Sequence, residues 1–134
     1  MKIKRLKIQH ILLILIFAVL GFYSYFVEPN QLEIKRYVIK DKELSGIKIV
    51  FPADFHARPY QRERLERIVE IINSEKPDIV LSVGDFPAGH TKNVTMQIEE
   101  IAEILSKINC KGGFYTTLGN HDGWYGNDRI KQAL

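Results

Sequence analysis

The sequence has a single cysteine and only four histidines among its 134 residues. One cysteine, Cys110, excludes an internal disulfide framework and a cysteine-rich zinc cluster, since each needs several thiols within the chain. The lack of thiolates also argues against a purely structural zinc site. Basic clusters are scarce after the first seven residues, and the charge pattern does not indicate a nucleic-acid-binding surface.

Acidic residues are absent before Glu28, whereas Lys2, Lys4, Arg5 and Lys7 make the start of the chain cationic. Residues 8–27 are uncharged and apolar, and as a helix they would span about 30 Å, enough to cross a bilayer. We expect residues 1–7 to be a cytoplasmic segment and 8–27 a retained single-pass anchor. The rest of the chain would then face outward. A cleaved secretory signal is the alternative, although the run is long for one and lacks an Ala-x-Ala-like exit.

The segment after the anchor alternates between strand and helix patterns. Residues 28–45 are predicted to be a linker with a leader strand, because apolar side chains alternate along 32–40. Residues 46–134 are predicted to be one domain. Its expected elements are a buried strand at 46–53, a helix at 61–76, a strand at 78–83, a helix at 98–108 and a strand at 113–118. This order predicts an α/β fold whose βαβ crossovers build one parallel sheet.

Polar residues with ligand chemistry follow each of the three predicted domain strands. The motifs are "DFH", "GD" and "GNHD", and each alone is common in ordinary turns. Because parallel strands end at the same edge of a sheet, the three motifs together predict one site there. Its members would be Asp54, His56, Asp85, Asn120, His121 and Asp122.

The donor types of this site favour a divalent transition metal. Carboxylate, amide and imidazole groups suit Mn, Fe or Zn. Asp54 and His56 are two residues apart and can turn toward the same ion, and Asp85 has two oxygens with which to bridge two ions. The sequence therefore predicts metal binding at this edge.

The three motifs, in this order, resemble the first three motifs of the calcineurin-like metallophosphoesterases over residues 47–124. The anchor and leader segment are similar to the bacterial membrane-anchored branch, which includes phosphodiesterases and UDP-diacylglucosamine pyrophosphatases. The resemblance implies a four-layer α/β/β/α sandwich, of which this chain supplies the amino-terminal βαβαβ half. It also implies two divalent ions, with Asp54 and His56 on one, Asp85 bridging and Asn120 on the second.

The resemblance further implies that His121 stabilises developing charge or protonates the departing oxygen, with Asp122 orienting its ring. The expected reaction is hydrolysis of a phosphodiester or pyrophosphate by a hydroxide that two metal ions generate near neutral pH. The substrate could be lipid-linked or contain a nucleotide. Arg58 is a candidate phosphate contact, because a guanidinium pairs with phosphate oxygens, and His90 is a candidate substrate contact. An ordinary surface arginine explains Arg58 equally well, and His90 is more typical of a solvent-exposed loop than of a substrate contact.

The chain departs from the family pattern in two respects. Ala53 stands where the family commonly has Ser or Thr, and the later histidines, including a Gly-His-x-His motif, are missing. We therefore expect a truncated, inactive piece with one sheet face uncovered and a tendency to aggregate. The alternatives are a catalytically silent, membrane-tethered binding or regulatory fragment, and a phosphomonoesterase or protein phosphatase.

Overall fold

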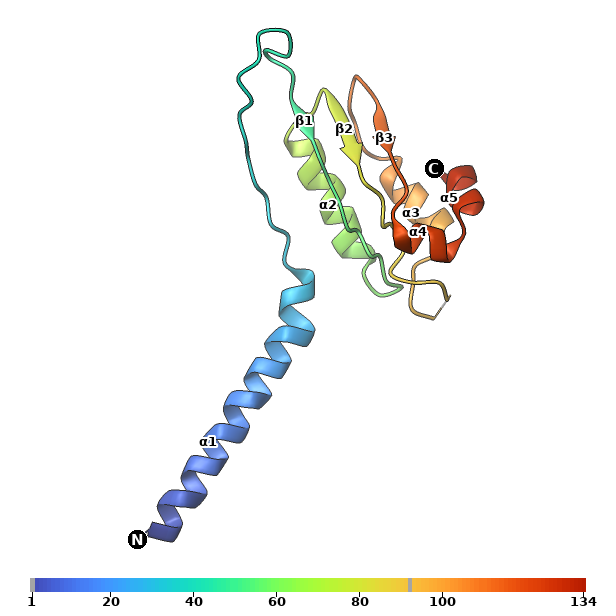
Figure 1. The fold of residues 1–134 in the computed structure, drawn as a ribbon. Coiled ribbons are helices and arrows are strands. Elements are labelled where there is room, and N and C mark those ends of the chain that lie inside the picture. The colour runs from blue at the N-terminus through green and yellow to red at the C-terminus, as the bar shows by residue number, and fades with distance from the viewer. Residues whose placement is uncertain (1, 92) are drawn as a thin grey trace. The chain divides into compact units, whose positions relative to one another are not determined.

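The computed structural model describes residues 2–91 and 93–134 (Figure 1). The chain divides into two compact units whose boundary falls between Tyr37 and Val38. Residue 1 of the predicted cationic segment 1–7, and the side chains of residues 2–6, lie outside the described residues.

The first unit is built on one long apolar helix. Helix α1 spans Lys2–Phe22 and continues into a π-helical segment at Tyr23–Val27 and a 3-10 turn at Glu28–Asn30. From Lys7 to Asn30 it is long and apolar enough to cross a membrane, a composition shared by anchors and secretory signals. The side-chain NH₂ of Asn30 donates to the Phe26 carbonyl (2.8 Å), one of the carbonyls near the helix end that lack a partner within the helix. The structure thus confirms the apolar helix, whereas its membrane topology stays a prediction.

The prediction of a leader strand at 32–40 is wrong, because the structure describes this whole segment and has no strand in it. Residues 31–40 have no regular secondary structure. Tyr37, Val38 and Ile39 are each more than four-fifths exposed. Alternation alone does not make a strand, because a strand needs a neighbouring strand for its backbone groups and a surface to cover with its apolar face.

The second unit contains the predicted parallel sheet. Strands β1 (Ile49–Val50), β2 (Ile79–Ser82) and β3 (Phe114–Thr116) pair in the order β1-β2-β3, and both pairs are parallel. Helix α2 (Arg62–Ser74) connects the first two strands, and α3 (Ile98–Leu105) connects the last two. The α/β order is therefore confirmed. β1 is much shorter than the predicted 46–53, and Pro52, which has no N–H to donate, follows it closely.

The hydrophobic core lies between the helices and one face of the sheet. Val80 on β2 is fully buried, and α2 and α3 turn their apolar stripes inward, as their helical spacing predicts. The inward-facing helical residues are Leu65, Val69 and Ile72 on α2, and Ile98, Ile101, Ile104 and Leu105 on α3.

The opposite face of the sheet is largely uncovered within the described residues. Residues directly opposite each other on paired strands share a face, which places Leu81 beside Tyr115 on this side. Ile49 and Tyr115 are 46% and 59% exposed, and Phe51 just after β1 is 60% exposed. This exposed apolar face agrees with the expectation that one side of the sheet lacks a covering layer.

The chain after β3 forms two short helices. Helix α4 spans Asn120–Tyr125, with Gly119 as its N-cap, and α5 spans Asn127–Ala133. Ile130 on α5 is fully buried in the same core as α3. The "GNHD" motif therefore opens a helix, which the sequence analysis did not predict.

The two faces of the sheet predict a contrast between two isoleucine truncations. Ile101→Ala should lower the free energy of unfolding by about 2–5 kcal/mol, because it leaves a cavity under a fully buried side chain. Ile49→Ala, on the uncovered face, should cost about 1 kcal/mol or less. Urea unfolding of the chain in detergent, followed by far-UV circular dichroism, measures both. Equal losses would mean that the outer face is packed.

Candidate metal centre

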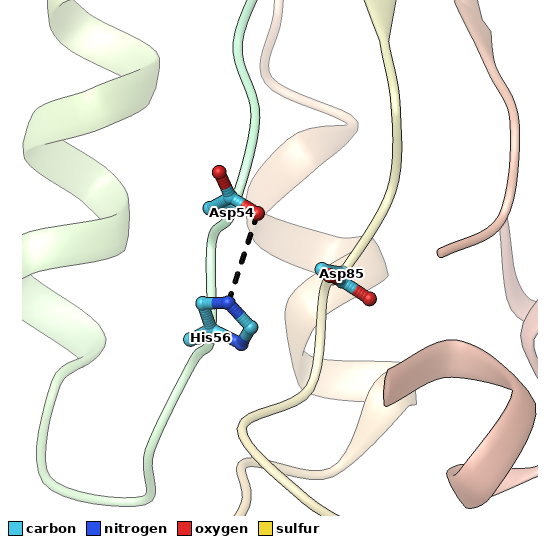
Figure 2. Close-up of side chains that lie close together, drawn as sticks. All are labelled: Asp54, His56 and Asp85. Carbon is cyan, nitrogen blue, oxygen red and sulfur yellow. Dashed lines mark ion pairs between the residues drawn. The ribbon is translucent and has the colours of Figure 1, made fainter. Parts of the chain in front are cut away.

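Three of the predicted ligands come together beyond the ends of β1 and β2. Asp54 and His56 follow β1, Asp85 follows β2, and each offers a ligand atom within 4.8 Å of the other two (Figure 2). His56 Nε2 lies 3.8 Å from Asp54 Oδ1. Asp54 is exposed and the other two are half-buried, so an ion would have a route to the group from solvent. Two carboxylates and an imidazole suit Mn, Fe or Zn, and three protein ligands leave coordination positions open, as catalytic sites do.

The backbone at these three residues is in an unfavourable conformation. Among the described residues, the non-glycine positions with positive φ are Asp54 (54°), His56 (41°), Lys76 (51°) and Asp85 (56°). This left-handed conformation costs a residue with a side chain about 1–2 kcal/mol. Three of the four such positions therefore coincide with the ligand group, a coincidence typical of functional sites, where the surrounding structure holds the strain.

The two ligand-bearing loops are held side by side by backbone and aromatic contacts. His56 N–H donates to the Asp85 carbonyl (2.9 Å), and Ala57 N–H donates to the Phe86 carbonyl (2.8 Å). The buried rings of Phe55 and Phe86 stack with centroids 5.1 Å apart. Sequence reasoning missed this pair, although a signal was present, because both acids are followed at once by phenylalanine.

The half-buried side chain of Arg64, on helix α2, supports the first loop. Arg64 donates an N–H to the carbonyl of Phe55 (2.8 Å), while its Nε is buried without a hydrogen-bond partner. Burial lowers the pKa of Arg64 below its ordinary value. Burying Nε without a hydrogen-bond partner costs free energy. In return, the bond to the Phe55 carbonyl restrains the backbone between Asp54 and His56. The helical pattern of α2 gave no sign of this contact.

The ring of His121 lies next to the ligand group, at the start of α4. Its Nδ1 is 3.0 Å from the Ala88 carbonyl, and a carbonyl only accepts, so Nδ1 carries the proton. The ring meets that of His56 edge to face at 4.4 Å between centroids, and lies 4.6 Å from that of Trp124. Nε2 is then the nitrogen with which His121 would exchange a proton.

Asp122 does not orient the His121 ring, which corrects the expectation from the sequence. It is completely buried, and its carboxylate accepts three backbone N–H groups, from Asp85 (2.7 Å), Phe86 (3.0 Å) and Gly119 (2.8 Å). The reason is its position in the first turn of α4, where a short acidic side chain turns back toward the helix start. The Ala88 carbonyl contacts the ring instead.

The remaining predicted site residues lie around this group without joining it in the described geometry. Asn120 is the exposed first residue of α4, adjacent to His121 in the chain. Arg58 is exposed in the turn before α2. His90 is exposed too, and with Trp124 it lines an open hollow of about 480 Å³. Their roles stay predictions.

Comparison with known proteins identifies relatives of this chain. A model of the calcineurin-like phosphoesterase family matches residues 47–133. An uncharacterized metallophosphoesterase of Aquifex aeolicus is 33% identical over 87% of this chain and 43% of its own length. A "transmembrane protein with metallophosphoesterase domain" of Danio rerio is 32% identical over 87% and 29%, respectively. The uncharacterized metallophosphoesterase YkuE of Bacillus subtilis is 30% identical over 84% and 41%.

The chain therefore spans less than half the length of these curated relatives. No solved structure matches it significantly.

The tight packing between the loops predicts that Gly84→Ala is far more damaging than Gly46→Ala. Both glycines have positive φ, so both substitutions introduce the same backbone strain. A Cβ at Gly84 would lie 2.5 Å from Asp122 Oδ2 and 2.6 Å from Gly119 N, whereas one at Gly46 would meet nothing within 4 Å. Gly84→Ala should therefore cost a further ~1–3 kcal/mol of unfolding free energy in urea melts. Similar costs for the two variants would contradict the described packing.

Proposed function

The chain belongs to the calcineurin-like phosphoesterase family, and we propose that it carries the metal-binding part of an enzyme that hydrolyses a phosphodiester or pyrophosphate. The observation that carries the proposal is the coincidence of Asp54, His56 and Asp85 in one group, each on strained backbone. Asp54 and His56 would hold one ion, Asp85 would be shared with a second, and Asn120 would be a further ligand of that second ion. Bound divalent ions, Mn, Fe or Zn, would neutralise phosphoryl oxygens and lower the pKa of water.

His121 is the proton donor in this proposal. Its Nδ1–H, held by the Ala88 carbonyl, keeps the ring beside the ligand group. A protonated Nε2 can then donate to the departing oxygen, which as an alkoxide is otherwise a poor leaving group. Because the ring also lies near Trp124 and the hollow shared with His90, the leaving group has room on that side. Arg58, which is exposed in the turn before α2, would contact a phosphoryl oxygen.

The helix α1 and the transmembrane relative support a membrane location. In this proposal residues 8–27 anchor the protein, the cationic start stays in the cytoplasm and the phosphoesterase domain faces outward. A lipid-linked or nucleotide-containing phosphoester is then the substrate class within reach.

Hydrolysis of bis(4-nitrophenyl) phosphate in the presence of Mn²⁺ tests the proposed reaction. The assay should use the protein encoded by the whole open reading frame that contains this sequence, because the curated relatives are longer than this chain. Asp85→Asn should abolish turnover, because it removes a shared anionic ligand. His121→Ala should slow it by about 10²- to 10⁴-fold, the usual contribution of a general acid. Asp128→Asn, an exposed change on α5, is the matched control.

Each alternative leaves its own signature in the same assay. Undiminished turnover in Asp85→Asn would refute the shared-ligand assignment. Mn²⁺ binding without any hydrolysis favours the silent binding or regulatory fragment. Faster cleavage of 4-nitrophenyl phosphate than of the diester favours a phosphomonoesterase.

Protease treatment of intact cells tests the orientation. A tag at the carboxyl terminus should be removed from outside, whereas one at the amino terminus should be protected until the membrane is opened. The reverse pattern would contradict the proposed topology.

A further inference from the structure

The completely buried carboxylate of Asp122 lies between two loops that carry other members of the site. Its Oδ2 accepts the N–H groups of Asp85 (2.7 Å) and Gly119 (2.8 Å), and its Oδ1 accepts that of Phe86 (3.0 Å). We propose that Asp122 is a positioning residue that sets the backbone of residues 84–86 and thereby aims Asp85 before any ion binds. This inference rests on the proposed role of Asp85 as a metal ligand.

The side chain of Asp85 returns the interaction. Its Oδ1 accepts the backbone N–H of His121 (2.8 Å), one residue before Asp122. The two acids therefore each bind the other's backbone segment, and together these four hydrogen bonds form what we call the carboxylate clamp. The clamp restrains Asp85 twice, through its own N–H and through its carboxylate. The bond from the N–H fixes the backbone of Asp85, and the bond to Oδ1 fixes the rotation of its side chain.

The glycines in the two loops support the clamp independently. A Cβ on Gly84 would lie 2.5 Å from Asp122 Oδ2, and a Cβ on Gly119 would overlap Asp85 Oδ1. Each carboxylate therefore approaches the backbone closely at a position where only glycine leaves the space. The sequence has glycine at both positions, which allows both carboxylates to approach the backbone this closely.

The three donors at position 122 are served by two acceptor oxygens, which a carboxylate side chain provides. An asparagine there has a single acceptor oxygen, and its NH₂ group would face backbone N–H groups that it cannot accept. Asp122→Asn keeps the size of the side chain and removes at least one bond of the clamp. It is therefore a sharper probe than Asp122→Ala, which would also leave a cavity.

Binding of Co²⁺ to the full chain in detergent micelles tests the positioning role. Asp122→Asn should raise the Kd for Co²⁺ by about 10- to 100-fold and change the visible d–d spectrum at saturation, because residues that orient ligands usually matter to that extent. Asp128→Asn, the same chemical change at an exposed site, should match the wild type in both. All measurements are made at a temperature where circular dichroism shows the variants fully folded.

The outcomes separate positioning from mere stability. If Asp122→Asn lowers only the melting temperature, while the Kd and spectrum of the folded protein stay unchanged, the inference is wrong. If the wild type binds no Co²⁺, the proposed function is wrong. Hydrogen exchange of the backbone amides in the metal-free protein then tests whether the carboxylate clamp exists. There, the N–H groups of Asp85, Phe86, Gly119 and His121 should be protected in the wild type and exchange faster in Asp122→Asn.

If Asp122→Asn does not fold, amide exchange of the wild type with and without Co²⁺ tests the inference. A clamp formed before metal binding predicts that Co²⁺ slows these four amides by less than about threefold, because the loops are already fixed. Slowing of tenfold or more would mean that the ion, and not Asp122, organises the loops. Rapid exchange of all four amides in the metal-free protein would also overturn the inference.

Discussion

The buried carboxylate of Asp122 is the constraint on which the candidate site depends. Removing a carboxylate from water costs on the order of several kcal/mol, and hydrogen bonds to a charged group return ~1.5–3 kcal/mol each. Asp122 is therefore stable in its buried place only while Asp85, Phe86 and Gly119 direct their N–H groups at it. Conversely, Asp85 has a positive φ, and in that conformation its N–H donates to the Asp122 carboxylate. The two loops and the acid between them stabilise one another, and none of them has this geometry alone.

The sheet brings the loops to the same edge, although its strands are short. Their pairing continues past the strand ends in another form, through the bond from His56 N–H to the Asp85 carbonyl and the isolated bridge between Ala57 and Pro87. The stacked rings of Phe55 and Phe86 lie buried beneath this continuation. Along each loop, the ligand side chain therefore points to the site while its neighbour packs into the core. This alternation places polar ligands on strained backbone directly above an apolar support.

Local pattern was sufficient to predict helices α1, α2 and α3, the parallel pairing of the strands and the gathering of Asp54, His56 and Asp85 at one edge. Each of those depends on periodicity or on where a strand ends. The contacts of Asp122 with the N–H groups of Asp85 and Phe86, and that of Arg64 with Phe55, join residues more than eight positions apart. Nothing near these residues in the sequence specifies such contacts. The leader strand failed for the same reason, because alternation describes a strand's faces and says nothing about a partner for its backbone. The helical start at Asn120 had a local signal, Gly119 with an acid three residues later, which the turn-like composition obscured.

His121 is tied to the second loop at both its backbone and its ring. Its N–H binds the Asp85 carboxylate and its Nδ1–H binds the Ala88 carbonyl, so segment 85–88 contacts it at both ends. The proposed proton donor therefore moves with the loop of the proposed shared ligand, although the two residues belong to different motifs. Any displacement of Asp85 would shift Nε2 relative to a substrate, and any rotation of the His121 ring would break a bond to the same loop. The geometry of proton donation is consequently coupled to the geometry of the ligand, because both depend on the position of residues 85–88.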